Sequence, residues 1–293
     1  MCPVPPAEPR AVTPALLQEW PLPEPDSEGG KHARGTVLVV GGAVSTPGAV
    51  LLAGLAALRV GAGKLKLVTV EATAVALGVA VPEAMVVGLP AGANGSLSPD
   101  CADDVAEQAG RADAVVVGPG LLGHDETGAL LEALLPQLDE AAVVLDAVAL
   151  TALAQRPHLA GRLAGRLALT PNSGEAAALL GDDGPTGRDA ALAVAQRYGA
   201  AVACPGGVAD HDGRVWSDES GGIGLGTSGS GDVMAGAVGG LLARGADPAQ
   251  AVVFGQYLHG AAGDRLAAQV GKVGFLAREL LDELPAVLTR VRD

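Results

Sequence analysis

The stretch TVLVVGGAVSTPGAVLLAGLAALRVGAGKLKLVTV, residues 36–70, indicates the fold of this chain. It opens with an apolar run of strand length that ends in two glycines. A helical segment follows, with Pro47 near its start and Gly61 or Gly63 at its end. The apolar run KLKLVTV then gives a second strand. This order is a βαβ unit, which predicts two parallel strands joined by a helix.

The same alternation continues along the chain. Further apolar runs are AMVVGL, DAVVVGPG, AVVLDAVAL, RLALTPN and AAVACPGG, with helical segments between several of them. Strands of this kind suit a mostly parallel sheet covered by helices on both faces. After residue 229 the pattern is helical, with Asp247 as an N-cap and Pro248 at the first helical position of one segment. No linker separates residues 36 and 285, so we expect a single α/β domain.

Residues 1–30 differ from the rest because they contain clustered prolines. We expect an extended arm or loop here, interrupted by one short helix with Thr13 as N-cap and Pro14 at its first position. The predicted organisation is therefore a proline-rich arm over residues 1–30 and an α/β domain over residues 31–293.

Composition excludes several classes of function. The formal charge is −14, only 2% of the 293 residues are aromatic, and no basic run is present, so nucleic acid is not an expected partner. No apolar run is long enough to span a bilayer, so no membrane partner is expected either. Cys2, Cys101 and Cys204 are odd in number and widely spaced, and the first ten residues lack a secretory pattern. We expect a cytoplasmic protein without structural disulfides.

Several predicted strands end in residues that suit a binding site. One ends in Gly118, Pro119 and Gly120, another in Asp146, and a third in LTPNSGE with Asn172 and Glu175. Ligands of open parallel sheets bind at the carboxyl ends of the strands, so these residues should converge at one edge. Asp146 would orient a substrate or metal there, or cap the next helix.

The stretch GLGTSGSGDVMAG, residues 224–236, is the strongest functional signal. Gly229, Ser230 and Gly231 can present consecutive backbone N–H groups, and the helix beginning near residue 231 adds its positive end, which predicts an anion site. Asp232, in the first helical turn, is close enough to take a proton from a hydroxyl held beside that anion. The plainer interpretation is an ordinary turn in which Asp232 caps the helix.

The remaining segments of the sequence match no established binding or catalytic motif. GGAVSTPG, after the first strand, matches neither a dinucleotide fingerprint nor a Walker loop, and no zinc spacing or G-x-S-x-G elbow occurs. His259, on an alanine-rich helix, is expected to be a core histidine. Asp264 is expected to be a solvated or capping acid.

Taken together, these segments resemble the ADP-dependent NAD(P)H-hydrate dehydratases, a branch of the ribokinase-like superfamily. The segments that carry the resemblance are KHARGTVLVVGG, TPGAVLLAGLAALRVGAGKLKL, VGPGL, VLDAVAL, LTPNSGEAAALL, GLGTSGSGDVMAGAVGGLLARG and YLHGAAGD, from Lys31 onwards. The resemblance implies a ribokinase-like fold, a homo-oligomer, and a repair reaction that dehydrates hydrated NADH or NADPH using ADP or ATP. Magnesium is implied as the cofactor.

The resemblance also implies roles for individual residues. Asp232 would be the base facing the substrate hydroxyl. The positions implied to bind the substrate are Ala49, Gly120, Asn172 and Asp232. The positions implied to bind the nucleotide are Gly229, Ser230, Gly231, Cys204, Gly206 and Gly207, and Glu175 is the implied metal-binding residue.

The chain departs from the family pattern at three places. Asn172, Ser173, Gly174 and Glu175 stand where His-Pro-Gly-Glu is usual, and Val148 stands where a second aspartate is usual. The strand end that usually carries a nucleotide-binding lysine is here ACPGGVA, around Cys204. Two alternatives follow: a ribokinase-like kinase of a vitamin-like hydroxyl, favoured by the Asn172-x-x-Glu175 pattern, and a catalytically silent nucleotide-binding protein, favoured by the missing lysine.

Overall fold

The computed structural model describes residues 9–24, 26 and 29–292. Cys2 and the first prolines of the predicted arm lie outside the described residues. The strands, in chain order, are β1 Arg10–Ala11, β2 Thr36–Val40, β3 Lys64–Val70, β4 Ala84–Leu89, β5 Ala114–Val117, β6 Ala142–Leu145, β7 Leu167–Leu169, β8 Ala201–Cys204, β9 Gly207–Ala209 and β10 Val215–Ser217. The α-helices are α1 Pro14–Glu19, α2 Pro47–Arg59, α3 Glu71–Ala80, α4 Ala102–Ala109, α5 His124–Leu134, α6 Val148–Ala154, α7 Ser173–Leu180, α8 Gly187–Tyr198, α9 Ser230–Ala243, α10 Pro248–Gln269 and α11 Ala277–Arg292. Short 3₁₀ turns are η1 Pro99–Cys101, η2 Leu135–Gln137, η3 Pro157–Leu163 and η4 Ile223–Leu225.

The strands form one sheet in the order β1-β10-β9-β8-β7-β6-β5-β2-β3-β4. Pairing is parallel from β8 to β4, whereas β9 pairs antiparallel with both β8 and β10. The expected mostly parallel α/β sheet is confirmed. From β2 the chain first adds strands on one side, β3 and β4, and then continues on the other side with β5. The junction of β2 and β5 is therefore a topological switch point, where sheets of this type bind ligands.

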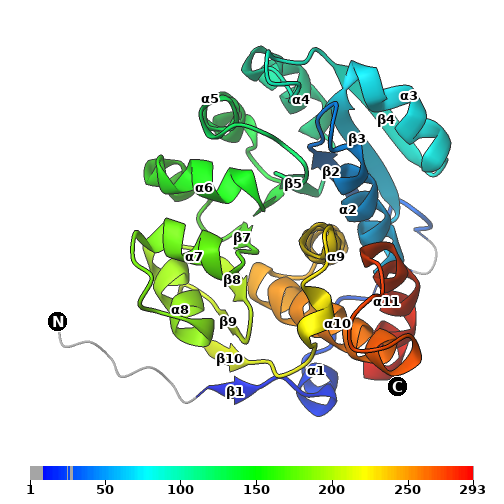
Figure 1. Ribbon diagram of the computed structural model, residues 1–293, viewed down its shortest axis with the longest axis vertical. Helices are drawn as coiled ribbons and strands as arrows, with labels where there is room; N and C mark the ends of the chain where they lie inside the picture. Colours follow the sequence, from blue (N-terminus) through cyan, green and yellow to red (C-terminus); the bar gives the residue numbers. More distant parts are fainter. Residues whose placement is uncertain (1–8, 25, 27–28, 293) are drawn as a thin grey trace.

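Helices cover both faces of this sheet (Figure 1). Side chains of β2 alternate between the faces: Val37 and Val39 belong to one core, and Leu38 and Val40 belong to the other. The first core contains residues of α1, α2, α9, α10 and α11, and the second contains residues of α4 to α8. Burial of both faces explains why the strands are continuous apolar runs.

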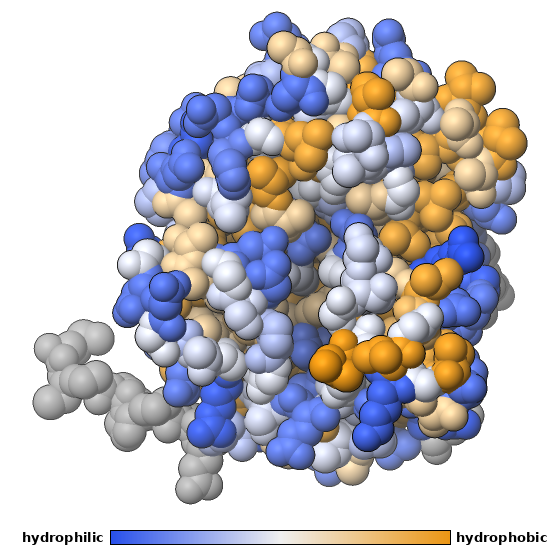
Figure 2. All heavy atoms as spheres, viewed as in Figure 1, coloured by the Kyte–Doolittle hydropathy of each residue, from blue (hydrophilic) through white to orange (hydrophobic). Residues whose placement is uncertain are grey.

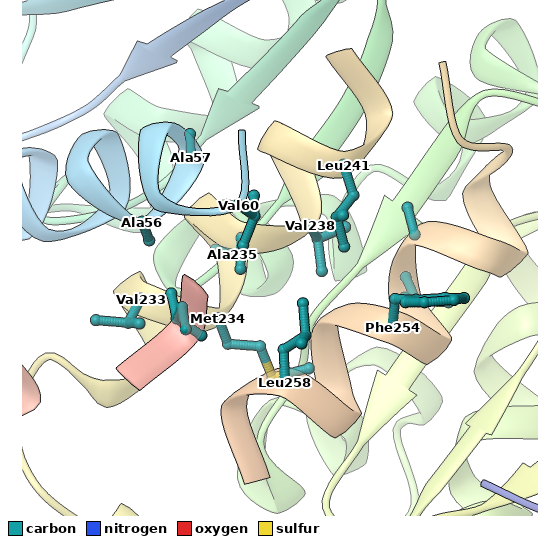
Figure 3. Packing of buried hydrophobic residues seen from close by; sticks show 14 of the residues in the cluster. Ala56, Ala57, Val60, Val233, Met234, Ala235, Val238, Leu241, Phe254 and Leu258 are labelled. Atoms are coloured by element: carbon teal, nitrogen blue, oxygen red, sulfur yellow. The ribbon is translucent and has the colours of Figure 1, made fainter. Parts of the chain in front are cut away.

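Helix α9 lies at the centre of the first core, where small residues allow neighbouring backbones to approach (Figure 3). A Cβ on Gly236 would lie 2.0 Å from the carbonyl oxygen of Ala53 on α2, and one on Gly240 would lie 2.6 Å from that of Ala57. Only glycine fits at these two positions. The close contact with α2 fixes where the N-terminus of α9 meets the edge of the sheet.

The N-terminal segment joins the sheet. The predicted helix is present as α1, and the Thr13 hydroxyl accepts a hydrogen bond from Leu16 N, as expected of an N-cap. Residues Arg10–Ala11, expected in an extended arm, pair parallel with Trp216 and Ser217 of β10 and form an edge strand. This pairing joins segments about 200 positions apart, which local sequence patterns do not encode.

None of the helices among the described residues combines the length and the apolarity needed to cross a membrane.

Candidate functional site

The N-terminus of α9 exposes backbone amides without a side-chain cap. Gly229, the N-cap, has φ +89°, a conformation that favours glycine, and no side chain caps the helix. A Cβ at Gly231 would meet no atom within 4 Å, so the space in front of this turn is open. Uncapped N–H groups at the positive end of a 14-residue helix form an anion site. Of the three amides predicted to bind the anion, that of Ser230 donates to Thr227 O at 3.2 Å, so the predicted site depends on the other N–H groups of this turn.

Ser230, the first residue of α9, is held by a histidine from α10. Its hydroxyl lies 2.7 Å from Nε2 of His259, and both residues are only 4% and 8% exposed, respectively. Burial lowers the pKa of His259 to about 4, so the imidazole is neutral near pH 7. His259 is therefore buried, as expected of a core histidine, but it also fixes the serine of the anion site.

Asp232 lies in the first turn of α9 and is partly exposed. One carboxylate oxygen points back toward the N-cap, since it lies 3.8 Å from the position of a Cβ built on Gly229. Burial raises the pKa of Asp232 to about 6. A carboxyl group with this pKa is ionised at pH 7 and suits a general base.

Asp146 follows β6 and is buried at the carboxyl edge of the sheet. Thr170, at the end of β7, donates a hydrogen bond of 2.8 Å to Oδ1 of Asp146. Burial, followed by the negative charges of Glu175 and Asp232, raises the pKa of Asp146 to about 7, against the lowering effect of the Thr170 hydrogen bond. Asp146 and Glu175, expected at one edge from their strand ends, are therefore close enough to interact electrostatically, and Asp232 from the start of α9 acts on the same group.

The residue after Asp146 has a strained backbone. Ala147 has φ +51° and ψ −129°, and no other described residue except glycine has a positive φ. Strain of this kind clusters at functional sites. The tight turn at Ala147 lets Asp146 complete the end of β6 while α6 begins at Val148.

Asn172 and Glu175 form a capping box at the start of α7. Asn172 Oδ1 accepts from the backbone N–H of Glu175 at 3.0 Å, and Glu175 Oε2 accepts from that of Asn172 at 2.9 Å. Burial raises the pKa of Glu175. The capping box leaves Glu175 one carboxylate oxygen that can face a ligand.

A cavity of about 510 Å³ lies at the carboxyl ends of β7 and β8, against the N-terminus of α9. Its size suits a small-molecule ligand. It is lined by Thr170, Pro171, Asn172, Ala203, Pro205, Gly206, Asp218, Glu219, Ser220, Gly221, Gly222, Leu225, Gly226, Ser230, Gly231, Met234, Gln256 and His259. None of these lining residues is a lysine or an arginine, so an anion here would depend on backbone amides and on any bound cation.

A second group of residues gathers at the switch point between β2 and β5. Gly42 N donates to Pro119 O at 2.7 Å, and the Thr46 hydroxyl donates to Gly120 O at 2.7 Å. A Cβ on Gly120 would lie 2.8 Å from the Cβ of Ala49, so these two predicted substrate residues are adjacent. One turn further along α2, Leu52 lies beside Gly229. A Cβ built on Gly229 would lie 2.5 Å from the side chain of Leu52. The glycines of the switch point therefore adjoin the N-terminus of α9.

Asp232 and Glu175 are not among the residues that line the 510 Å³ cavity, and the other predicted site residues fall into different places. Asn172, Gly206, Ser230 and Gly231 line the 510 Å³ cavity, with Gly229 at the N-cap beside them, whereas Ala49 and Gly120 lie together at the switch point. Cys204 lines a separate cavity between α7 and α8, and Gly207 packs against the backbone of Arg188, where a Cβ would be 2.3 Å from its Cα. Of the three residues predicted in the β8–β9 region, only Gly206 faces the larger cavity.

Several polar residues of the cavity were not predicted to bind a ligand, His259 and Asp218 among them. His259 was expected to be a core residue, and Asp218 carried no sequence motif. Asp218 is 4% exposed, accepts hydrogen bonds from N and Oγ of Ser220, and has a pKa raised by burial. Asp264, expected to be a solvated or capping acid, accepts from Gly221 N at 3.0 Å and caps this loop.

The residues at this edge fit a magnesium ion that arrives with a nucleotide. No group of three or more His, Cys, Asp or Glu side chains among the described residues could hold a metal alone. Mg²⁺, however, is commonly held by one or two carboxylates together with substrate phosphates. Asp146 and Glu175 each use one oxygen in a hydrogen bond to Thr170 and to the Asn172 amide, respectively, and burial raises the pKa of both.

Comparison with known proteins identifies relatives that share one description. A family model described as NAD(P)H-hydrate dehydratase matches residues 37–286. A protein of Xanthomonas campestris, named ADP-dependent (S)-NAD(P)H-hydrate dehydratase, is 44% identical over 96% of this chain and 97% of its own. The structure of an ADP/ATP-dependent NAD(P)H-hydrate dehydratase from Bacillus subtilis, co-crystallised with ATP and Mg²⁺, has a TM-score of 0.78 and 28% identity, covering 97% of this chain and 99% of that one. A ribokinase-like superfamily protein from Enterococcus faecalis has a TM-score of 0.82 at 23% identity, over 97% of both chains, and supports the fold.

Proposed function

Because the chain belongs to the NAD(P)H-hydrate dehydratase family, we propose that it dehydrates hydrated NADH and NADPH at the expense of ADP, giving AMP and phosphate. The observation that carries this proposal is the uncapped N-terminus of α9, which opens on a cavity and carries Asp232 in its first turn. A phosphoryl group and a hydroxyl-activating carboxylate would be neighbours there.

Two adjoining spaces support a reaction between two substrates. The 510 Å³ cavity ends at Ser230 and Gly231 and would hold the nucleotide, with its terminal phosphate on the amides of α9. The switch-point residues Ala49 and Gly120 would hold the hydrated nicotinamide ring. Asp232 lies on the helix turn that adjoins both spaces.

The proposed chemistry needs one proton acceptor next to the phosphate. The Asp232 carboxylate accepts the proton of the ring hydroxyl, whose oxygen attacks the terminal phosphorus of ADP while AMP leaves. Phosphate then leaves the ring together with a proton from the neighbouring ring carbon, which restores the reduced nicotinamide. The neutral His259 keeps the Ser230 hydroxyl at the phosphate position.

Charge at the phosphates has to be balanced without a lysine from the cavity wall. Asp146 and Glu175 would hold Mg²⁺ between the sheet edge and the nucleotide. Magnesium, when bound there, would neutralise the phosphates and polarise the terminal phosphoryl group. Burial and, to a smaller extent, nearby carboxylates raise the pKa of Asp146, so a cation would favour its ionised form.

The test is turnover of the Asp232→Asn variant. Wild-type protein incubated with hydrated NADH, Mg²⁺ and ADP or ATP should restore the absorbance of reduced nicotinamide. Asp232→Asn should lower kcat by about 10²- to 10⁴-fold, because it removes the base and changes little volume, while nucleotide affinity stays within a few fold. Exposed Asp212, outside both spaces, supplies the control Asp212→Asn, which should retain full activity.

The same assay separates the alternative functions. Consumption of ATP only with a vitamin-like alcohol would support the kinase. Nucleotide binding without turnover of any substrate would support the silent protein. Unchanged turnover in Asp232→Asn would reject the assigned base.

We further propose that the protein forms a homo-oligomer through α3 and β4. Val75 and Val79, one turn apart on α3, are 81% and 79% exposed, and Met85 on β4 is 54% exposed. Figure 2 displays this hydrophobic surface at its upper right. β4 ends the sheet, so its outer edge has backbone groups that a second copy could pair. A self-complementary contact of this kind is typical of two-fold dimers.

A further inference from the structure

A second cavity lies at the end of the sheet that β1 forms, beside β10 and α1. Figure 1 shows these three elements side by side. The volume of this cavity is about 340 Å³, and it is lined by Arg10, Leu16, Glu19, Trp20, Arg214, Val215 and Trp216. It shares no lining residue with the larger cavity. Nothing in the proposed reaction uses it.

Both tryptophans of the chain line this cavity. Their rings stack with centroids 5.8 Å apart and an angle of 15° between the planes. Trp216 is only 2% exposed, and its Nε1 has no hydrogen-bond partner within the described part of the chain. Buried polar atoms normally have a partner, so an unsatisfied donor in the wall of a cavity is unusual. Trp20 is partly exposed and offers ring surface on which an aromatic ligand can stack.

The charged residues of the wall have different roles. Arg214 is already engaged, because its Nε pairs with Asp210 at 2.5 Å and its guanidinium lies 5.6 Å from the Trp216 ring. Arg10 and Glu19 are exposed, and their side chains make no hydrogen bond or ion pair with any other residue that the structure describes. One free cation and one free anion thus border the same cavity beside an aromatic surface.

We propose that this cavity binds a small zwitterion with an aromatic ring, of the aromatic amino acid class. The ring stacks on Trp20, the carboxylate pairs with Arg10, and the ammonium pairs with Glu19. A phosphate ester fits less well, because Glu19 would repel its second charge. A nucleotide fits the 510 Å³ cavity better than this one of 340 Å³.

The experiment is a fluorescence titration of the full chain with L-phenylalanine, which does not absorb at the excitation wavelength of tryptophan. Since both tryptophans line the cavity, the signal reports on this cavity alone. We expect a saturable change in wild type, and no saturation up to about 10 mM would overturn the proposal. Saturating ADP should leave the titration unchanged, whereas competition by ADP would place the ligand in the larger cavity instead and also overturn it.

Two charge variants and two analogues test the assigned contacts. Arg10→Gln should weaken the binding of phenylalanine about tenfold. It should not weaken the binding of phenethylamine, which lacks the carboxylate. Glu19→Gln should weaken the binding of phenylalanine to a similar extent. It should not weaken the binding of 3-phenylpropionate, which lacks the ammonium group. Arg111→Gln, at an exposed arginine far along the chain, is the control and should bind as wild type. Wild-type affinity in both Arg10→Gln and Glu19→Gln would contradict the proposal. The readout is binding, so it is independent of the proposed dehydratase activity.

Discussion

At the scale of single residues, Asp232 links burial to chemistry. Its carboxyl must be ionised to accept a proton, and burial raises its pKa to about 6. We therefore expect kcat/KM to be constant above pH about 7 and to fall as the pH drops through 6, approaching tenfold per unit. The measurement is kcat/KM for hydrated NADH between pH 5 and 8.5 at saturating ADP. A profile that stays flat down to pH 5 would contradict Asp232 as the base.

Ala147 shows how the same edge stores backbone strain. Its φ of +51° with ψ −129° costs a residue with a Cβ about 1–3 kcal/mol, and glycine would remove this cost. After the entropy penalty of glycine, Ala147→Gly should raise the free energy of unfolding by about 1 kcal/mol. Thermal or urea unfolding measures the change. Ala177→Gly, inside α7 without such strain, is the matched control and should lower stability by about 1 kcal/mol.

At the scale of elements, the pair α2–α9 sets the position of the anion site. Ala at Gly236 would place a Cβ 2.0 Å from the backbone oxygen of Ala53, so the helices would have to separate. We expect Gly236→Ala to cost about 1–3 kcal/mol in unfolding experiments. Gly48→Ala, on the partner helix α2, would meet no atom within 4 Å and should be neutral or stabilising. Equal stability of the two variants would show that the close approach is not essential.

At the scale of the whole molecule, the exposed face of α3 and β4 bears on assembly. If a second copy covers Val75 and Val79, a charge there would be buried without a partner. Val79→Glu should therefore shift the protein to a smaller species in light scattering coupled to size exclusion. The control Val270→Glu changes an exposed valine at the end of α10, where the oligomer should be unaffected. An identical mass for wild type and Val79→Glu would refute this interface.

Features set by neighbouring residues could be predicted from the sequence, whereas features set by contacts between distant segments could not. The strands KLKLVTV and AMVVGL are present with the predicted bounds as β3 and β4, and the caps Thr13 and Asp247 both accept the expected backbone hydrogen bonds. These features depend on neighbours within a few positions, where the apolar period and capping chemistry act. The short strands β9 and β10 were not predicted, because three residues carry too little pattern. The division into an arm over residues 1–30 and a domain over residues 31–293 stays a prediction.

The sequence by itself determined the parallel α/β fold, the family, and the glycine-rich turn that precedes Asp232. These follow from local periodicity, from backbone freedom at glycine, and from ordered motifs along one chain. Only the tertiary structure decided that His259 holds Ser230, that Cys204 faces a different cavity from Gly206, and that both tryptophans meet at the far edge of the sheet. Such contacts join residues from distant elements, and their geometry depends on how the helices and strands pack. A single sequence does not encode that packing in any short stretch.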